Sequence, residues 1–439
     1  MFTAGFSKVC ISPPVGSPLA GFAARQGVST GVHDDLFARA LVLENADAAI
    51  ALVSVDVLAL PSEFVRRVRA MIQQRTGIQQ DAIMIASTHT HSGPVTIKTF
   101  FNPEGSVDAT YMDRLARAIE ESVAAGWRER FPARVGVGTG HVAGVGVNRR
   151  SADQRPVDEE IGIIKVEDAD HQTRAVFINY ACHPTVLGPD NLLATGDFPA
   201  FAVEEVEEAI GPDGFAMFVN GTQGNISMGH SSELSAIGVI TPGRTFARAA
   251  ELGHLLADAT LKTLPGIKTT DAPVLGKISV PVELPLKKYP SVEETARALR
   301  EAEDRLRQLS SEDGKDDEEL RRAKSEQLYA SITNFYAGEA RTMLDGLLRI
   351  ELQGVRIDDA VFVAIPAEVF VEIGLRLKSL APHRTFIIGI ANGYIAYLPT
   401  REAYEVGGYE VVSAKCQPES EDILIENIIR LEERLFGAS

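Results

Sequence analysis

Short runs of β-branched and other apolar residues alternate along this chain with longer segments of helical periodicity. The runs predict strands at 50–55, 82–87, 161–166, 175–180, 360–365 and 386–390. The periodic segments predict helices at 62–75, 109–125, 199–210, 246–263 and 369–379. An acidic turn between 161–166 and 175–180 indicates a hairpin. The sequence therefore predicts an α/β fold with a mixed β-sheet body and flanking helices.

Residues 291–341 are rich in Ala, Glu, Arg and Leu and differ from the rest of the chain. Leu299, Ala302, Leu306 and Leu309 recur at helical spacing, so each helix should carry one apolar stripe. We interpret the segment as a helical hairpin inserted in a single catalytic domain spanning residues 1–439. Two helices packed on the body, a dimerisation arm and an active-site lid are the alternatives, and the oligomeric state stays open.

The composition excludes several classes of function. The 439 residues contain 43 Lys plus Arg and 60 Asp plus Glu, a net charge of −17 that opposes binding to nucleic acid. Gly138 to Ala143 fits the dinucleotide pattern, but an extended pattern follows it instead of a helix. No apolar stretch approaches the roughly 20 residues of a transmembrane helix. We expect a small-molecule or lipid-like substrate.

The N-terminal sequence and the cysteines bear on localisation. Residues 1–8 lack a basic region followed by an apolar one, as a secretory signal would have. The three cysteines form an odd set without metal-type spacing, which favours reduced thiols. Both observations lead us to expect a cytoplasmic protein.

Two histidines follow the predicted strand at 82–87 in the segment Ser87-Thr88-His89-Thr90-His91-Ser92-Gly93-Pro94. In extended backbone, residues two apart share a face, so His89 and His91 can point into one cleft. A metal could take one imidazole and leave the other for proton transfer. The alternative is a pair of surface histidines on a loop.

Further polar residues follow other predicted strands. His183 comes after 175–180, Glu368 after 360–365, and Tyr397 after 386–390. Strand ends are where open α/β sheets carry their sites. Two imidazoles and one carboxylate are typical of catalytic zinc, and a phenolic oxygen can join them.

Four acidic or aromatic residues near predicted strand ends or helix starts could have a structural role instead of a role in the site. Glu368 could be a first-turn acid that offsets a helix dipole, and Tyr397 a core aromatic. Asp197 precedes a helical pattern, so it is either an N-cap or a support for the site. Asp56, at the end of 50–55, either supports a ligand or lies in a solvated turn.

Seven segments in order resemble the catalytic domain of the neutral/alkaline ceramidase family. They are Gly31 to Ala40, Ser87 to Pro94, Val147 to Arg149, Ala181 to Pro184, Gly221 to Ser227, Pro366 to Glu368, and Asn392 to Thr400. The resemblance covers about Phe6 to Tyr409, and Thr88 to Pro94 is its most specific part.

The resemblance implies that zinc is held by His89, His183, Glu368 and Tyr397. It places Arg149 as an active-site arginine, Ser227 as a proposed nucleophile and Asp197 near the site. The family usually reads Gly-Asp-Val-Ser-Pro-Asn at this serine, whereas this chain reads Gly224-Asn225-Ile226-Ser227-Met228-Gly229. The changed surroundings favour water as the nucleophile, with Ser227 hydrogen-bonding the substrate or that water.

Together these observations predict a zinc-dependent hydrolase of ceramidase type that cleaves an N-acyl amide of a sphingolipid-like substrate through zinc-activated water. His91 would relay protons, and Arg149 would stabilise the developing oxyanion or bind a substrate hydroxyl. A zinc hydrolase acting on an ester, a lactone or a small amide is the alternative. A metal-binding protein without turnover is a third possibility.

Overall fold

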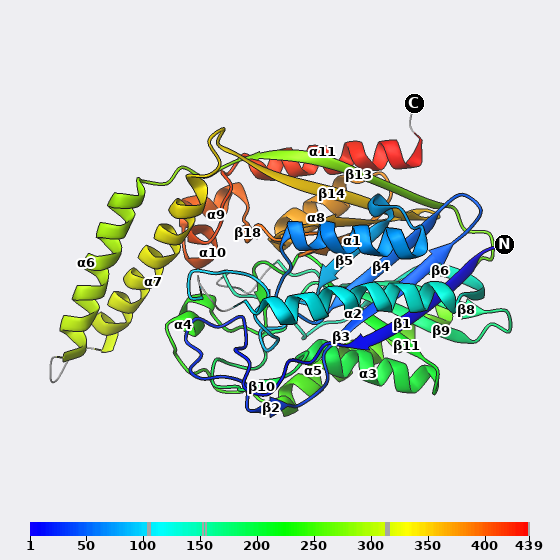
Figure 1. Cartoon of the computed structure of the whole chain (residues 1–439), viewed down its shortest axis with the longest axis horizontal. Coiled ribbons are helices and arrows are strands. Elements are labelled where there is room, and N and C mark those ends of the chain that lie inside the picture. Colours follow the sequence, from blue (N-terminus) through cyan, green and yellow to red (C-terminus); the bar gives the residue numbers. More distant parts are fainter. Residues whose placement is uncertain (103–106, 152, 154–155, 312–316, 438–439) are drawn as a thin grey trace.

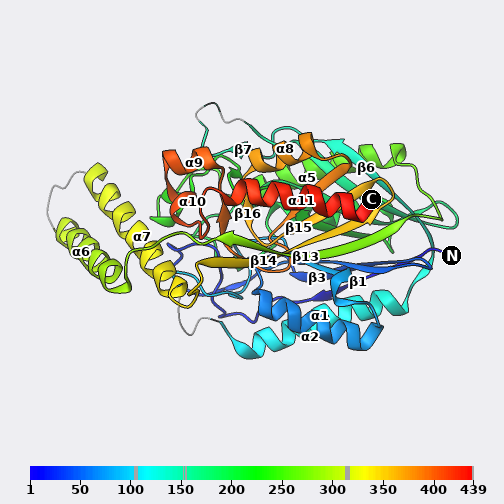
Figure 2. The same cartoon turned by 90° about the horizontal axis from the view of Figure 1, so that it is seen from above.

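Two β-sheets face each other between outer layers of helices (Figures 1 and 2). The structure is a computed structural model and describes residues 1–102, 107–151, 153, 156–311 and 317–437. The large sheet has the order β11-β9-β8-β6-β1-β3-β4-β5 and contains both parallel and antiparallel pairs. The small sheet has the order β13-β14-β15-β17. This architecture confirms the predicted α/β fold with a mixed sheet and flanking helices.

The strand bounds are as follows. The large sheet comprises β1 (Thr3–Cys10), β3 (Phe37–Glu44), β4 (Ala49–Val55), β5 (Ile83–Ser87), β6 (Phe131–His141), β8 (Glu160–Asp168), β9 (Thr173–Tyr180) and β11 (Phe215–Asn220). The small sheet comprises β13 (Leu275–Pro285), β14 (Leu347–Ile357), β15 (Ala360–Ile365) and β17 (Arg384–Gly389). The short strands are β2 (Gly31–Val32), β7 (Val147–Asn148), β10 (Leu193–Ala194), β12 (Ile226–Ser227), β16 (Glu368–Val369) and β18 (Tyr397–Leu398).

Helices cover the outer faces of both sheets. They are α1 (Ser62–Thr76), α2 (Ala109–Arg128), α3 (Phe198–Ile210), α5 (Phe246–Thr263), α8 (Val371–Leu380) and α11 (Ser420–Phe436). The shorter helices are α4 (Ser232–Ala236), α9 (Arg401–Val406) and α10 (Tyr409–Val412). Apolar residues of α1 and α2 pack on one part of the large sheet and those of α3 and α5 on another, while α8 and α11 cover the small sheet. Between the sheets, Phe362 stacks on Phe386 and meets Phe177 edge to face. Burial of this inner apolar layer holds the sheets together.

The large sheet curls so that its two ends meet. β11, at one end of the strand order, contacts β4 and β5 at the other. The buried Ser54 hydroxyl of β4 donates to the Phe218 carbonyl of β11 at 2.5 Å. Because of this curl, the loops that follow β5, β9 and β11 come together, although β9 and β5 are far apart in the strand order.

Two helices, α6 (Val292–Ser311) and α7 (Asp317–Ala340), lie side by side within the segment predicted as a hairpin and project from one end of the body (Figure 1). Residues 312–316 lie outside the described part of the chain. The expected stripe of α6 is half-buried against α7. The helix α7 packs on the body through Leu328, Ile332 and Tyr336. No helix in the described ranges is long and apolar enough to cross a membrane. All three cysteines are free.

Candidate metal and catalytic site

His89 and His91 lie in the loop that directly follows β5. The Thr88 amide donates to the Val55 carbonyl at 2.9 Å and the His89 amide to the Val57 carbonyl at 3.0 Å, which fixes the loop against the end of β4. The two histidines face the same cavity, as predicted, but the expected extended backbone is wrong at His89, whose φ is +69°. A non-glycine residue in this left-handed region is strained, which is common at functional sites.

His183 occupies the equivalent position after β9. Its amide donates to the Ile226 carbonyl at 3.0 Å, and its Nδ1 lies 2.7 Å from the Gln223 carbonyl. The Nδ1 of His89 lies 2.7 Å from the Leu58 carbonyl in the same way. Backbone carbonyls thus hold Nδ1 of both rings as the donor and leave both Nε2 atoms as acceptors, the arrangement found for metal-binding histidines.

Both Nε2 atoms converge on Glu368. Its Oε2 lies 2.9 Å from His183 Nε2 and 3.5 Å from His89 Nε2, and all three side chains are buried. Glu368 belongs to β16, before α8 begins, and Glu372 is the acid in the first turn of that helix. The interpretation of Glu368 as a helix-dipole acid is therefore wrong.

Tyr397 is brought beside Glu368 by the backbone. The parallel pair of β16 and β18 puts Glu368 and Tyr397 in register. The Tyr397 hydroxyl accepts from Arg149 Nη2 at 3.2 Å, and its ring stacks at 6.5 Å from that of His183. The four predicted zinc ligands are therefore brought together at one site.

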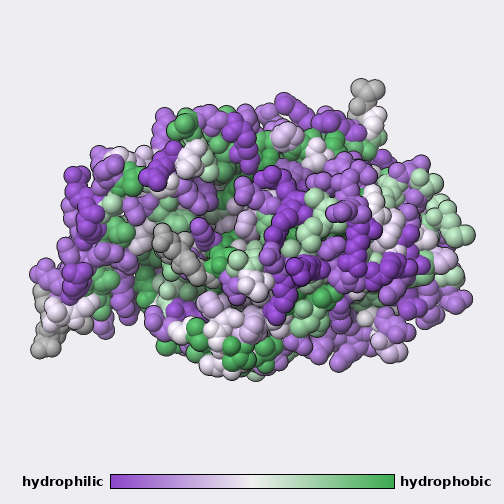
Figure 3. Space-filling view, in the orientation of Figure 1, coloured by the Kyte–Doolittle hydropathy of each residue, from purple (hydrophilic) through white to green (hydrophobic). Residues whose placement is uncertain are grey.

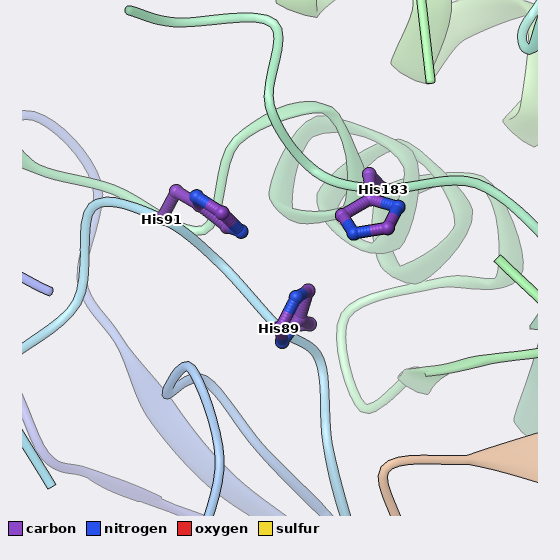
Figure 4. A group of neighbouring side chains, drawn as sticks. All are labelled: His89, His91 and His183. Carbon is purple, nitrogen blue, oxygen red and sulfur yellow. The ribbon is translucent and has the colours of Figure 1, made fainter. Parts of the chain in front are cut away.

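His91 completes a cluster of three imidazoles whose rings point toward one another (Figure 4). The His91 ring centroid is 4.9 Å from that of His89 and 6.0 Å from that of His183. Both His91 ring nitrogens are buried, and neither has a hydrogen-bond partner among the residues that the structure describes. Unlike the other two rings, His91 is not oriented by a carbonyl.

Charges within the site favour the protonation states that a metal requires. Burial lowers the pKa of His183 to about 4, with Arg149 adding to the effect, and burial together with the neighbouring imidazoles holds the pKa of His91 well below its usual range. Burial alone would raise the pKa of Glu368, but His89 and His183 outweigh it and hold that pKa well below its usual range. Neutral imidazoles and an ionised carboxylate are the forms that bind a metal. With the unpartnered His91 nitrogens, they fit a zinc ion.

Arg149 follows β7 and reaches the cluster beside Tyr397. Besides Tyr397, its guanidinium contacts the Gly224 carbonyl at 2.9 Å and Glu410 Oε1 at 2.9 Å. Arg150 contacts the other oxygen of Glu410 at 2.6 Å. This buried ion pair fixes the Arg149 fork next to Tyr397.

Ser227 lies in β12 and is fully buried. Its hydroxyl donates to the His230 carbonyl at 3.2 Å and accepts from the Gly229 amide at 3.3 Å. A nucleophilic serine needs a base at its proton, and this proton is directed to a backbone carbonyl. Whether Ser227 or water is the nucleophile stays a prediction.

The two predicted supporting acids have different surroundings. Asp197 caps α3 by accepting from the Phe198 amide at 2.8 Å, and it also accepts from the amides of Val186 and Leu187, in the loop after His183. It is therefore both an N-cap and a support for that loop. Asp56 instead accepts from the Phe37 amide at 2.8 Å and from Arg39 at 3.3 Å. Its carboxylate thus links the end of β4 to the start of β3, and it does not contact any of the described histidines.

Tyr394 was not among the predicted site residues. Its hydroxyl donates to Glu368 Oε1 at 2.6 Å, so both carboxylate oxygens are engaged. Glu410, which orients Arg149, was also missed. Tyr394 follows Asn392-Gly393, a turn signal that could have marked it, whereas nothing around Glu410 distinguishes it from a surface acid.

The cluster forms one end of an apolar cavity of about 400 Å³. His89, His91, Glu368 and Tyr397 line it at one side, and its apolar walls comprise Leu58, Ile97, Phe100, Phe101, Val107, Phe335 and Tyr336. Phe335 and Tyr336 belong to α7, so the hairpin contributes one wall. The surrounding face is mainly hydrophilic, with apolar side chains gathered in a hollow between the hairpin and the body (Figure 3).

Comparisons with known proteins place the chain in a family. The chain is 22% identical to a neutral ceramidase from Pseudomonas aeruginosa over 95% of its own length and 70% of that protein. It is 24% identical to a neutral ceramidase from Drosophila melanogaster over 46% of its own length, and this match spans only 31% of the fly protein. The crystal structure of the Pseudomonas aeruginosa enzyme superposes with a TM-score of 0.75 at 18% identity, covering 99% of this chain and 75% of that one, and shows the same fold. The model of the neutral/alkaline non-lysosomal ceramidase N-terminal region matches residues 2–232, more than half of the sequence, and this chain therefore belongs to that family.

Proposed function

We propose that this protein is a zinc-dependent hydrolase that cleaves the amide bond of an N-acyl substrate. The observation that carries the proposal is the apolar cavity of about 400 Å³ that ends at His89, Glu368 and Tyr397. This volume is within the range of small-ligand sites. Its apolar walls suit an acyl chain, and the polar end receives the carbonyl. The relatives described above are neutral ceramidases, which agrees with this class of substrate.

His89, His183, Glu368 and Tyr397 are the residues that would hold the zinc. A zinc ion bound there would act as a Lewis acid and would lower the pKa of bound water toward neutrality. Tyr394 keeps Glu368 in place through its hydroxyl, and the carbonyls of Leu58 and Gln223 orient the two histidines.

His91 is the proposed proton carrier. It is neutral, its ring nitrogens are unpartnered within the described residues, and it faces the cavity beside the ligands. It can therefore take a proton from the attacking water and return it to the leaving amine. Arg149 is fixed beside Tyr397 by Glu410, and its fork can stabilise negative charge on the carbonyl oxygen without losing its own proton.

A substrate panel tests the proposal. N-acyl amides, including a short-chain ceramide, are compared with the matching esters and with lactones, before and after removal of metal by a chelator and after zinc is restored. We expect amide hydrolysis that is lost with the metal and recovered with zinc. Hydrolysis of esters or lactones alone would identify the alternative hydrolase, and zinc binding without turnover would contradict an enzymatic role.

A matched pair of histidine variants accompanies this panel. His183→Ala should abolish both zinc retention and turnover. His254→Ala is the control, because His254 is exposed on α5 and pairs with the surface acid Glu205. Full activity of the His183 variant would contradict the proposed site.

A further inference from the structure

A second, much smaller cavity lies on the other side of His91 and Tyr397. Its volume is about 40 Å³, compared with about 400 Å³ for the apolar cavity. His91 and Tyr397, together with Gly21 and Tyr409, border both cavities, so the reaction centre lies between the two. An amide bound at the proposed zinc site would therefore direct its two substituents into compartments of very different size.

The large cavity has room for one long chain. An apolar protein cavity of about 150 Å³ accommodates the six-carbon ring of benzene, so about 400 Å³ corresponds to about sixteen carbons. The walls away from the reaction centre are mainly apolar and include Phe100, Phe101 and Phe335. This capacity matches the acyl chain of one fatty acid and is too small for two chains of that length.

The small cavity has polar walls. The imidazole of His230 and the hydroxyls of Thr185 and Ser232 line it, together with the guanidiniums of Arg149 and Arg244. Burial, with a contribution from Arg244, lowers the pKa of His230 to about 4, so this imidazole is uncharged at neutral pH and can donate or accept a hydrogen bond. A volume of about 40 Å³ accommodates about three water-sized groups. The cavity therefore suits a short group that forms hydrogen bonds.

The charges around the small cavity are balanced by carboxylates of the protein. Arg149 pairs with Glu410 at 2.9 Å. Arg244 is partly exposed to solvent, and the carboxylates of Asp190 and Asp197 attract its charge. Because the chain itself supplies these counter-charges, the substrate does not have to bring one. An uncharged hydroxyl, which can both donate and accept, is the simplest partner for these walls.

Phe22 limits the small cavity on one side. Its ring centroid lies 5.0 Å from that of His91, and the guanidiniums of Arg25 and Arg244 lie 5.1 Å and 5.6 Å from it. The side chain is buried, and the two cations over the ring help to hold it in place. Phe22 thus restricts the group bound on this side of the reaction centre, whereas Phe335 restricts the group in the large cavity.

A longer amine part would meet polar surface beyond the small cavity. The adjoining groove of about 230 Å³ is lined mainly by polar residues, among them Arg150, Glu233 and Glu410. A further groove of about 440 Å³, which the small cavity meets at Ala23 and Ala236, also has a mainly polar exposed surface. An alkyl chain in either groove would displace water from polar groups without replacing its hydrogen bonds, which is unfavourable.

We propose that the substrate carries one long chain, its acyl chain, and that its amine part is a small, uncharged amino alcohol whose size Phe22 limits. This inference rests on the proposed function and narrows it to single-chain N-acyl amides. The acyl chain lies in the large cavity, and the hydroxyl of the amine part lies in the small one. In the reaction, water adds its hydroxyl to the acyl carbon, the C–N bond breaks, the nitrogen takes the proton, and a fatty acid and an amino alcohol leave.

Three amides with the same acyl chain test the size of the amine part. They are N-dodecanoylethanolamine, N-dodecanoylphenylalaninol, which adds a benzyl group, and N-dodecanoylsphingosine, which adds a second long chain. They are compared at equal mole fraction in the same detergent micelles. We expect the wild-type kcat/KM for the ethanolamide to exceed the other two about 100-fold or more, since even one methylene changes kcat/KM about 10- to 200-fold in a fitted pocket. Hydrolysis of the sphingosine amide at the kcat/KM of the ethanolamide would overturn the inference.

Two further amides test the hydroxyl and the absence of charge. In N-dodecanoylpropylamine a methyl group replaces the hydroxyl at nearly the same size. Its kcat/KM should be about 3- to 10-fold below that of the ethanolamide, the range for one uncharged hydrogen bond. N-dodecanoylglycine, whose carboxylate is charged, should also be hydrolysed more slowly. Equal kcat/KM for the propylamide, or a higher value for the glycine conjugate, would contradict an uncharged hydroxyl in the small cavity.

Variants of Phe22 test its role in limiting the amine part. Phe22→Ala makes room for a phenyl ring and should shift the ratio of kcat/KM about 10-fold or more toward the phenylalaninol amide and away from the ethanolamide. Phe22→Leu should shift this ratio less, because leucine fills part of the space. Phe335→Ala is the matched control, since it removes the same ring from the large cavity. It should keep this ratio and change the preference among acyl chain lengths. An equal change on both amides in Phe22→Ala would overturn the role of Phe22.

Calorimetric binding of the same amides to the zinc-loaded protein separates this inference from the proposed function. If no amide is hydrolysed, the proposed function is contradicted. Tighter binding of the ethanolamide by the wild type, and of the phenylalaninol amide by Phe22→Ala, would still support the inference in that case. If all the amides are hydrolysed at similar kcat/KM, the proposed function is supported and the inference is overturned.

Discussion

The hydrogen bond from Tyr394 to Glu368 provides a sharp test of the proposed zinc site. Tyr394→Phe keeps the aromatic ring and removes only the hydroxyl, which donates to Glu368 Oε1 at 2.6 Å. Glu368 is buried, so no solvent replaces the lost donor. A hydrogen bond to a charged group contributes about 1.5 to 3 kcal/mol. Each 1.4 kcal/mol corresponds to about a factor of ten, so the zinc affinity should fall about 10- to 100-fold.

The assay is competition for zinc with a chelator of known affinity. Tyr404→Phe is a matched control. The Tyr404 hydroxyl, on α9, also donates a hydrogen bond of 2.6 Å, but its acceptor is the backbone carbonyl of Cys416. This control should lose about 0.5 to 1.5 kcal/mol of unfolding free energy, as measured with urea, and keep the zinc affinity of the wild type. Equal zinc affinity in Tyr394→Phe and the wild type would refute the view that Glu368 is a metal ligand held by Tyr394.

Four further outcomes are expected. Purified protein should contain about one zinc per chain by elemental analysis, and His89→Ala should lose it on dialysis. His91→Ala should keep the zinc and lose about 10²- to 10⁴-fold in turnover, whereas loss of zinc would make His91 a ligand. Ser227→Ala should stay active, and an acyl group on wild-type Ser227, detected by mass spectrometry after a rapid quench, would contradict water as the nucleophile. Burial raises the pKa of Asp197 to about 6, above the unfolded value of about 4, so its contribution to stability is present below pH 4 and is lost as the pH rises through 6. Asp197→Asn should therefore flatten the pH dependence of the unfolding free energy between pH 4 and 6, as measured with urea.

The sequence predicted those helices and strands in which apolar residues recur at regular spacing within the element itself. The helix predicted at 246–263 begins and ends where α5 does, because Thr245 caps it and one face is buried. The pattern missed β13, which has prolines and many half-exposed residues, since a strand with little buried surface lacks a hydrophobic signature. β6 was also missed, since only residues 144–148, which follow it, were interpreted as extended. Only glycine fits at position 136, because a Cβ there would lie 2.1 Å from the Lys268 carbonyl oxygen. A strand with several glycines has few side chains from which an alternating hydrophobic pattern could be recognised.

The candidate site was predictable where residues directly follow strands, as His89, His183 and Glu368 do. The contacts that join these strand ends were not, because they depend on the curl of the large sheet and on the two-residue pair of β16 and β18. Backbone strain also carries no clear sequence signal. His89, Ile390 and Ala396 all have positive φ near the site, and a β-branched residue such as Ile390 rarely does. Such strain persists where surrounding contacts enforce it.

The positions of the two cavities divide substrate recognition between different parts of the chain. The apolar cavity takes one wall from α7, through Phe335 and Tyr336, whereas the small polar cavity takes its far wall from His230 and Arg244, around α4. Because His91 and Tyr397 border both, we expect the scissile bond to lie between the cavities. Changes in the hairpin should therefore alter selectivity for the acyl chain, while changes near α4 alter selectivity for the amine. Gly21 and Tyr409 also line both cavities, so changes at these two positions should alter both preferences together.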